Sequence, residues 1–272
     1  MSLQDSADRI AKGAAAQERL LGRTCAPPKT LFESSWRDYL FAEVWTRPGL
    51  ELRARYLIAI PSAAANNGTP EQLDDYVRGA LTQQLLSVAE LREVAVHSAV
   101  YSGWSAGSLI DAAVTRIVAE LDLAEEPYVP LRDEPWDPKV RLEQGAAEFN
   151  NVMTFGGPPP VSPYFEGGIL NFVFGEMWSR PGLDQRSRRW VTLVGVADSS
   201  AVVPIETHIY GAMASGNASY EEMNEFVLQY AVHSGWPRAS FVQGVVMKMA
   251  KYLNQGLFWD GSKQESDDAA SK

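Results

Sequence analysis

The sequence has almost no cysteine and very little histidine. Cys25 is the single cysteine among 272 residues, which excludes an intrachain disulfide, a CxxC redox pair and a thiolate zinc site. The chain has three histidines, and a metal site built from several imidazoles would need nearly all of them. We therefore expect a protein that works without a metal or a redox cofactor.

Basic residues and long apolar runs are scarce as well. The 24 Lys+Arg residues are outnumbered by 34 Asp+Glu, so the formal net charge is −10, and this balance disfavours binding to nucleic acid or to anionic membrane surfaces. The amino terminus lacks a basic stretch followed by an apolar one, and no apolar run is long enough to span a bilayer. These absences indicate a cytoplasmic protein.

The motifs of the common catalytic classes are also missing. The chain contains no G-x-G-x-x-G followed by an acidic residue, no Walker-type phosphate loop, no H-E-x-x-H and no G-x-S-x-G. Nucleotide, zinc-protease and serine-hydrolase chemistry therefore lack support. We expect acid–base chemistry on a small-molecule substrate.

What the chain does contain is a repeat. Residues 43–50, EVWTRPGL, return at 176–183 as EMWSRPGL, an offset of 133, and VYSGW at 100–104 returns at 232–236 as VHSGW. The similarity extends over about residues 9–122 and 141–254, which predicts two copies of one structural unit. We assign residues 1–122 to an N-terminal domain, 123–140 to a linker, 141–257 to a C-terminal domain and 258–272 to a tail that we expect to be disordered.

Helical signals dominate both copies. Apolar residues recur at intervals of three and four between Pro and Gly breaks, and strand signals are weak. Ser87 with Glu90 fits a capping box, and Ser219 begins the same pattern in the second copy, so a helix is predicted to start at each place. Pro61 and Pro204 are expected to kink or end their helices. The predicted fold class is all-α.

Two of these helices carry a row of polar side chains. After the first capping box, Glu93, His97 and Tyr101 follow at spacing four and therefore share one helix face. The second copy places Glu225, Gln229 and His233 on the matching face. Such a row is either part of a site or the solvated side of an amphipathic helix.

Other polar candidates stand alone. His208 precedes a run of small residues and is either a catalytic group or a satisfied structural histidine, and the first copy has Tyr76 in its place. Arg47 and Arg180 each precede Pro-Gly. They either bind a substrate carboxylate bidentately or pair with the acidic residue four positions earlier.

Taken together, these motifs resemble the 4-carboxymuconolactone decarboxylase family. FGEMWSRPGL at 174–183, HIYGA at 208–212 and VHSGWP at 232–237 are similar to signature segments of that family, and EVAVHSAVYSGW at 93–104 matches in the first copy. The resemblance covers nearly the whole chain and implies a tandem fusion of two alkylhydroperoxidase D-like helical domains. It also implies a homo-oligomer, with a trimer of tandem chains forming a ring of six domains.

The resemblance also bears on the chemistry. Related disulfide reductases carry a CxxC, but its slots here hold Thr69 and Gln72 in the first copy and Ala201 and Pro204 in the second. The family therefore implies a cofactor-independent decarboxylase or other lyase that acts on a small carboxylated or lactone-type ring compound, as in aromatic catabolism. Two alternatives stay open: an isomerase, hydratase or cyclase on the same scaffold, and a catalytically silent binding or scaffold protein.

The residues that would serve such a site come from both copies. His208 and His233 are the expected acid–base groups, with Glu206 or Glu225 to orient an imidazole, and we expect the second copy to carry the principal chemistry. The analogous set in the first copy is Glu93, His97 and Tyr101. The residues expected to bind the substrate are Arg180, Trp178, Trp236, Glu225, Tyr76 and Trp104.

Overall fold

The computed structural model describes residues 6–125, 127–131 and 137–263, and these ranges form an all-α protein. The first half, up to residue 122, contains α1 (Ser6–Leu21), α2 (Leu31–Ser35), the π-helix η1 (Trp36–Val44), α3 (Leu52–Ala65), α4 (Pro70–Thr82), α5 (Val88–Ser102) and α6 (Trp104–Glu120). The second half, from residue 137, contains α7 (Pro138–Met153), the π-helix η2 (Tyr164–Trp178), α8 (Gln185–Ser199), α9 (Val202–Ala214), α10 (Tyr220–Ser234) and α11 (Trp236–Asn254). Within the described ranges, the only β pairing is a bridge between Leu257 and Lys263.

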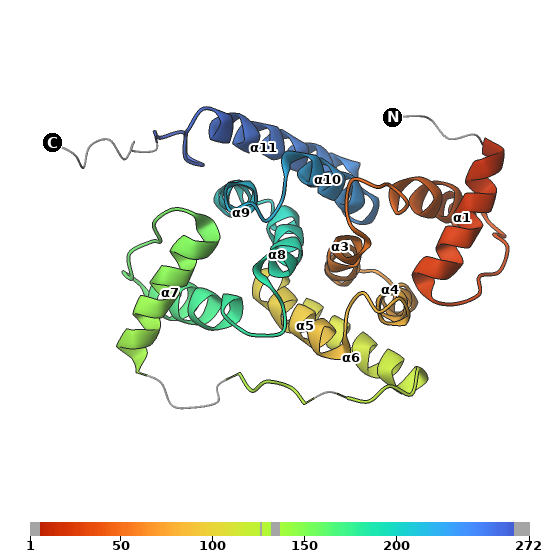
Figure 1. Cartoon of the computed structure of the whole chain (residues 1–272), viewed down its shortest axis with the longest axis horizontal. Helices are drawn as coiled ribbons and strands as arrows, with labels where there is room; N and C mark the ends of the chain where they lie inside the picture. Colours follow the sequence, from red (N-terminus) through yellow and green to blue (C-terminus); the bar gives the residue numbers. More distant parts are fainter. Residues whose placement is uncertain (1–5, 126, 132–136, 264–272) are drawn as a thin grey trace.

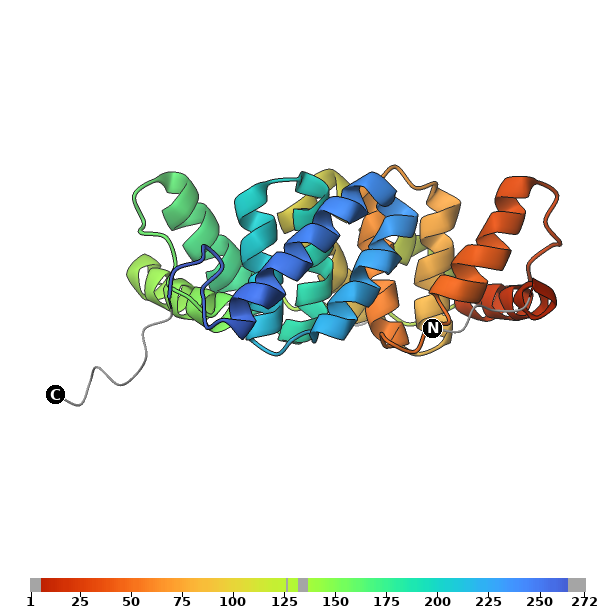
Figure 2. The same ribbon diagram turned by 90° about the horizontal axis from the view of Figure 1, so that it is seen from above.

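The second half repeats the helix order of the first. Figure 1 shows α5 and α6 along one long edge and α10 and α11 along the opposite edge, with α3 and α8 between them. A half-turn in the plane of that picture brings each helix close to its counterpart. Seen from above, α1 and α7 stand at opposite ends of the molecule (Figure 2). Two copies of one helical unit around a twofold axis would give this arrangement.

The helix starts expected from the capping boxes are confirmed. The Ser87 and Ser219 hydroxyls each accept a hydrogen bond from the backbone N–H three residues later, and the glutamate at that position binds back to the cap. Gly103 and Gly235 follow with φ of 89° and 91°, a region open to glycine. The chain therefore turns sharply, and α6 and α11 begin at the very next residue.

Neither of the two prolines that were expected to kink or end a helix ends it, and a kink at either place stays a prediction. Pro61 lies inside α3, which continues to Ala65. Pro204 lies in the first turn of α9, where a missing N–H removes no helical hydrogen bond. The prediction that Pro61 ends a helix is wrong, because the surrounding side chains are almost all buried and packing holds the helix together.

One hydrophobic core runs through both halves. The central helix α3 packs against α8 and α10, and α5 packs against α8. Fully buried side chains of the first half, such as Leu57 and Ile58, and of the second half, such as Leu193, belong to one cluster. A smaller cluster, which includes Phe174 and Trp178, lies between α7 and η2. The two halves therefore share a core, and residues from one half can complete a site in the other.

The structure revises the predicted limits of the linker and the tail. The helix α7 starts inside the predicted linker, because Asp137 caps it and Pro138 occupies its first position. At the other end, Trp259 packs against the core and its ring lies 5.9 Å from that of Phe155. Disorder from residue 258 onward is thus wrong for 258–263, and the rest of that tail lies outside the described residues.

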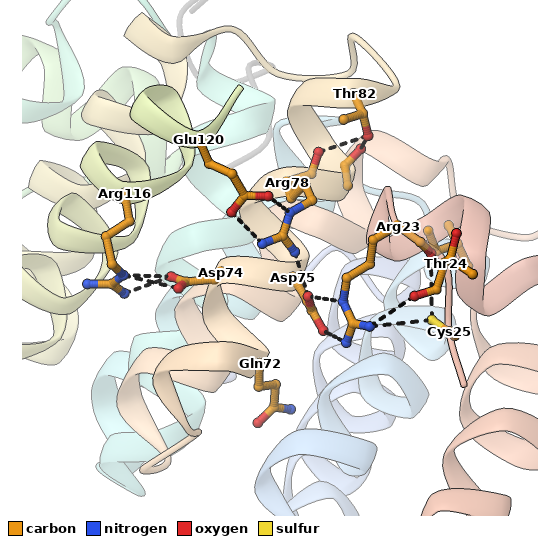
Figure 3. Close-up of polar contacts among 12 residues, drawn as sticks. Arg23, Thr24, Cys25, Gln72, Asp74, Asp75, Arg78, Thr82, Arg116 and Glu120 are labelled. Carbon is orange, nitrogen blue, oxygen red and sulfur yellow. Dashed lines mark hydrogen bonds and ion pairs between the residues drawn. The ribbon is translucent and has the colours of Figure 1, made fainter. Parts of the chain in front are cut away.

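The single cysteine lies at the edge of an ion-pair network that fastens α4 to its neighbours (Figure 3). The carboxylate of Asp75 accepts hydrogen bonds from Arg23 and Arg78, both at 2.6 Å, and Arg78 also binds Glu120 on α6. Burial raises the pKa of the Cys25 thiol beside this network. The thiol is therefore protonated at neutral pH.

No helix in the described part of the chain combines the length and the apolar character needed to cross a bilayer.

Candidate functional site

A cluster of polar and aromatic side chains lies where α5 of the first half meets α8 and α9 of the second. We call it the composite site. Its members are His97 and Tyr101 on α5, Trp178 at the end of η2, Arg189 and Thr192 on α8, and His208 on α9. All of them are buried except Tyr101, which is partly exposed. The repeated helices thus bring candidate residues from both halves into one place.

Direct contacts hold this cluster together. The Trp178 indole N–H donates to the Tyr101 hydroxyl at 2.7 Å, and Nε2 of His97 lies 2.8 Å from Oγ1 of Thr192. The imidazole of His97 meets the Trp178 ring edge-on at 5.1 Å, and that of His208 meets the Tyr101 ring edge-on at 5.3 Å. The four rings therefore pack against one another in one cluster.

Both imidazoles of the composite site are neutral. Burial lowers the pKa of His97 and of His208 well below the ordinary value, and the positive charge of Arg189 lowers both further. Nδ1 of His208 lies 3.4 Å from the Arg189 guanidinium, which can only donate. This contact favours the tautomer of His208 that carries its proton on Nε2.

The remaining nitrogen of His97 is without a partner. Nδ1 is fully buried and makes no hydrogen bond within the described chain. A buried polar atom without a partner costs free energy. A ligand that hydrogen-bonds to Nδ1 would remove that cost.

Arg189 supplies the charge of the composite site. Its guanidinium is 0% exposed and donates to the carbonyl of Val152 at 2.6 Å and to Oδ1 of Asn217 at 3.3 Å. It also lies over the Trp178 ring, 4.9 Å from the centroid. Burial lowers the pKa of Arg189 to about 10, so it stays protonated at neutral pH. None of its contacts in the described chain is a carboxylate.

A second cluster occupies the position related by the repeat. Nε2 of His233 lies 3.0 Å from the Tyr76 hydroxyl, and its Nδ1 lies 2.9 Å from the carbonyl of Gln229. Tyr76 in turn stacks on Trp45. Burial lowers the pKa of His233 to about 4. At the place of Arg189 this cluster has Tyr56, whose hydroxyl donates to a backbone carbonyl, so the second cluster is uncharged.

This geometry separates the two histidines that the sequence suggested as acid–base partners. His208 contacts Arg189 and Tyr101, whereas His233 contacts Tyr76. His208 and His233, the two expected acid–base groups, therefore lie in different clusters. The helix α5 packs against α8 of the second half, and His97 on α5 belongs to the same cluster as His208. That the second copy carries the principal chemistry stays a prediction.

The glutamates pair with cations in this structure. Glu93 accepts hydrogen bonds from Arg180 at 2.6 Å and from the buried Arg188 at 3.2 Å. Glu225 binds two arginines of the first half in the matching way. Glu206 pairs with Lys248 at 2.7 Å. In the described chain these carboxylates pair with cations and not with imidazoles, so the orienting roles expected for Glu206 and Glu225 stay predictions without support from these contacts.

The guanidinium of Arg180 also has all its partners within the protein. Besides Glu93, its guanidinium donates to the carbonyls of Val129 and Pro130 in the segment that joins the halves. All three of its nitrogens thus have acceptors in the protein. The expectation that Arg180 holds a substrate carboxylate stays a prediction, and the guanidinium pairs with Glu93 rather than with Glu176, the acidic residue four positions earlier.

Two of the predicted tryptophans lie outside the composite site. Trp236 is 55% exposed and Trp104 is 69% exposed. Trp104 stacks on Phe172 at 6.2 Å and, with Arg180, lines a separate surface pocket of about 640 Å³. Of the predicted substrate-binding residues, Trp178 is in the composite site and Tyr76 is in the second cluster.

Sequence reasoning missed Arg189 and Thr192. The one signal for Arg189 is a difference between the copies, because the matching position of the first copy holds Tyr56. Thr192 likewise differs from the residue at the matching position of the first copy, which is Ala59. Neither difference shows by itself which residues lie beside a histidine. In the described ranges, no group of three or more His, Cys, Asp or Glu side chains is arranged to hold a metal ion.

Comparison with known proteins agrees with this picture of the fold. The model of the carboxymuconolactone decarboxylase family matches residues 31–114. The chain is 35% identical over 99 residues to nitrosuccinic acid decarboxylase npaB of Metarhizium robertsii, covering 36% of this chain and 68% of that protein. It is 26% identical over 89 residues to 4-carboxymuconolactone decarboxylase of Acinetobacter baylyi, covering 33% and 66%. The matches thus span about two thirds of the length of each of these relatives. The chain belongs to the carboxymuconolactone decarboxylase family.

Proposed function

We propose that the chain is a decarboxylase that acts on a small carboxylic acid carrying an electron-withdrawing group, and that the reaction takes place at the composite site. The observation that carries this proposal is the meeting of His97, His208 and Tyr101 around the buried cation Arg189. The names of the two relatives, both decarboxylases, support the reaction class. The repeat in sequence and helix order supports two copies of the family's structural unit. The composite site then contains the charged Arg189, whereas the second cluster is uncharged.

The proposed chemistry follows from the charges. When the C–C bond to the carboxylate breaks, CO2 leaves and the bonding electron pair moves into the electron-withdrawing group, which becomes an oxyanion. Hydrogen-bond donors fixed around that oxyanion lower the barrier. Neutral imidazole N–H groups are weak acids but effective donors of this kind. His208, through Nε2–H, and His97 are therefore assigned to bind the developing oxyanion.

The carbon that loses CO2 must receive a proton. Tyr101 can supply it, because its hydroxyl lies within the composite site and its side chain is partly exposed. Burial raises the pKa of Tyr101 to about 12, so the hydroxyl is protonated at neutral pH. Water can then reprotonate it after each turnover. No step of this scheme passes through a metal or a redox group.

The test is a direct measurement of CO2 release. Purified protein is incubated with 4-carboxymuconolactone, nitrosuccinate and simple β-keto acids, and products are followed by mass. Loss of CO2 from at least one acid supports the proposal. A product of unchanged mass would identify an isomerase or cyclase, and a gain of water a hydratase. No turnover of any of them would contradict the proposal and favour a binding role.

Matched variants tie any activity to the composite site. His208→Gln should lower kcat by about 100-fold or more, the usual effect of losing one oxyanion donor. His233→Gln, in the second cluster, is the matched control and should keep near-normal turnover. Equal losses in both variants would contradict the assignment.

A further inference from the structure

The buried arginines of the chain differ in one respect. Three guanidiniums are at most 1% exposed: Arg55, Arg188 and Arg189. Arg55 lies 3.0 Å from the carboxylate of Glu225, and Arg188 lies 3.2 Å from that of Glu93. Arg189 has only neutral partners in the described chain. Removing a cation from water is costly unless an anion compensates for it, so Arg189 is the one of the three that lacks its counter-ion.

The contacts of Arg189 leave part of the guanidinium weakly bound. One terminal nitrogen makes a good hydrogen bond to the carbonyl of Val152 at 2.6 Å. The other makes only long contacts, 3.4 Å to His208 and 4.0 Å to the sulfur of Met153. Hydrogen bonds weaken at such distances. An anion at this nitrogen would gain a charge-assisted hydrogen bond without displacing a strong one.

The position is also specific to one half. The matching residue of the first half, Tyr56, is neutral, and its hydroxyl is already bound to the carbonyl of Leu20 at 2.6 Å. No cation replaces Arg189 next to His233, because Arg55 is held by Glu225 and Gln229. The two clusters therefore differ in whether an anion can be bound.

We propose that Arg189 is the anion-recognition residue of the composite site and that each chain binds one anionic ligand there. This proposal deepens the proposed function and rests on the same site. The ligand's negative group lies against the weakly bound nitrogen of Arg189, beside His208 and the unpartnered Nδ1 of His97. Tyr101 is the partly exposed member of the composite site, so the ligand enters from the side on which Tyr101 lies.

The chemistry of decarboxylation then narrows the substrate class. Negative charge leaves the carboxylate as CO2 forms, so a cation bound to that carboxylate would stabilise the ground state more than the transition state and slow the reaction. Arg189 therefore binds a different group, one that keeps or gains negative charge. The substrate is therefore an acid with a second anionic group, such as another carboxylate, that stays in the product.

Binding of succinate tests the proposal without requiring any reaction. Succinate is a dicarboxylate that has no electron-withdrawing group positioned to support loss of CO2. Isothermal titration calorimetry at neutral pH should give one succinate per chain. Arg189→Gln should raise Kd by about tenfold or more, the usual effect of losing a charge-assisted hydrogen bond, and Arg189→Lys should recover part of the affinity. Tyr56→Phe, at the matching position, should bind as the unchanged protein does.

The outcomes separate this inference from the proposed reaction. Succinate binding that depends on Arg189, in a protein that releases no CO2 from any acid, would refute the reaction and leave the anion site standing. Unchanged binding in Arg189→Gln, two succinates per chain, or no binding at millimolar succinate would overturn the anion site. A cooperative thermal unfolding transition shows that each variant is folded. If Arg189→Gln does not fold, the affinity of Arg189→Lys for succinate tests the anion site in its place.

Discussion

Glu225 of the second half binds Arg47 of the first half, with Oε1 2.5 Å from the guanidinium. In the matching pair the halves exchange roles: Glu93 of the first half binds Arg180 of the second half at 2.6 Å. Each glutamate also contacts one fully buried arginine of the opposite half. The arginines of the repeated Arg-Pro-Gly segment therefore join the two halves through these ion pairs, and the pair of Arg180 with Glu93 ties α5 to the second half.

This relationship predicts that loss of the carboxylate destabilises the fold. In Glu225→Gln, the buried Arg55 keeps its charge without a counter-ion, so the free energy of unfolding should fall by about 3–5 kcal/mol. Urea unfolding followed by circular dichroism measures the change. Glu221→Gln, an exposed residue on the same helix, is the control. Equal stability of the two variants would show that the cross-half pair contributes little.

The glycine of the repeated segment should also be sensitive to substitution. Gly182 has φ of +97°, and a Cβ there would lie 2.9 Å from Cγ of Glu93. Gly182→Ala should therefore cost about 1–3 kcal/mol through backbone strain, plus displacement of Glu93. Gly156→Ala is the matched control, since its Cβ would meet nothing within 4 Å. If Gly182→Ala had the same melting temperature as Gly156→Ala, the close approach of residue 182 to the Glu93 side chain would be contradicted.

We expect the turnover rate to show no fall between about pH 9 and pH 6 that comes from protonation of a histidine. Burial and the nearby cation hold the pKa of His97 and His208 well below 6.5, so neither titrates between about pH 6 and pH 9. Arg189 loses its charge as pH rises through its pKa of about 10, so kcat/KM should fall there.

Arg189→Lys should move this alkaline limb to lower pH, because lysine has a lower ordinary pKa than arginine. An acid limb near pH 6.5 that disappears in His208→Gln would contradict the neutral-imidazole assignment.

Assembly into a trimer of chains stays a prediction, and exposed apolar side chains at both ends of the molecule support it. Leu31 and Phe32 in the first half and Val161 and Tyr164 in the second are each at least 67% exposed. Sedimentation at micromolar concentration should give the mass of three chains, and Phe32→Ser with Tyr164→Ser should lower it. A monomer of the unchanged protein would contradict the ring.

Local signals in the sequence predicted local structure well. The capping boxes at Ser87 and Ser219 place both helix starts, because the hydrogen bonds involved lie within four residues. The spacing of His97 and Tyr101 on one helix face is also set by the helix alone. The all-α class follows from many such segments together.

The composition of the site could not be predicted in the same way. His97 and His208 belong to different copies, and only the packing of α5 on α8 brings them together. Arg189 lies in a run with Arg186 and Arg188, and nothing local distinguishes the arginine without a carboxylate from those that have one. The contacts of His97 with Thr192 and of Glu93 with Arg188 each join residues 95 positions apart. Those of Arg189 with Val152 and His208 join residues 37 and 19 positions apart on different helices, and local sequence predicts neither kind.

If His97 of the first half and His208 of the second serve one site, a double-mutant cycle on kcat/KM should show that the two residues are coupled. His97→Gln and His208→Gln should each lower kcat/KM by about 100-fold, and the double variant should lose far less than the product of the two losses, because the residues act as a unit. His233→Gln should leave kcat/KM near its normal value, alone or combined with either. Full activity in His97→Gln together with a 100-fold loss in His233→Gln would contradict a shared site.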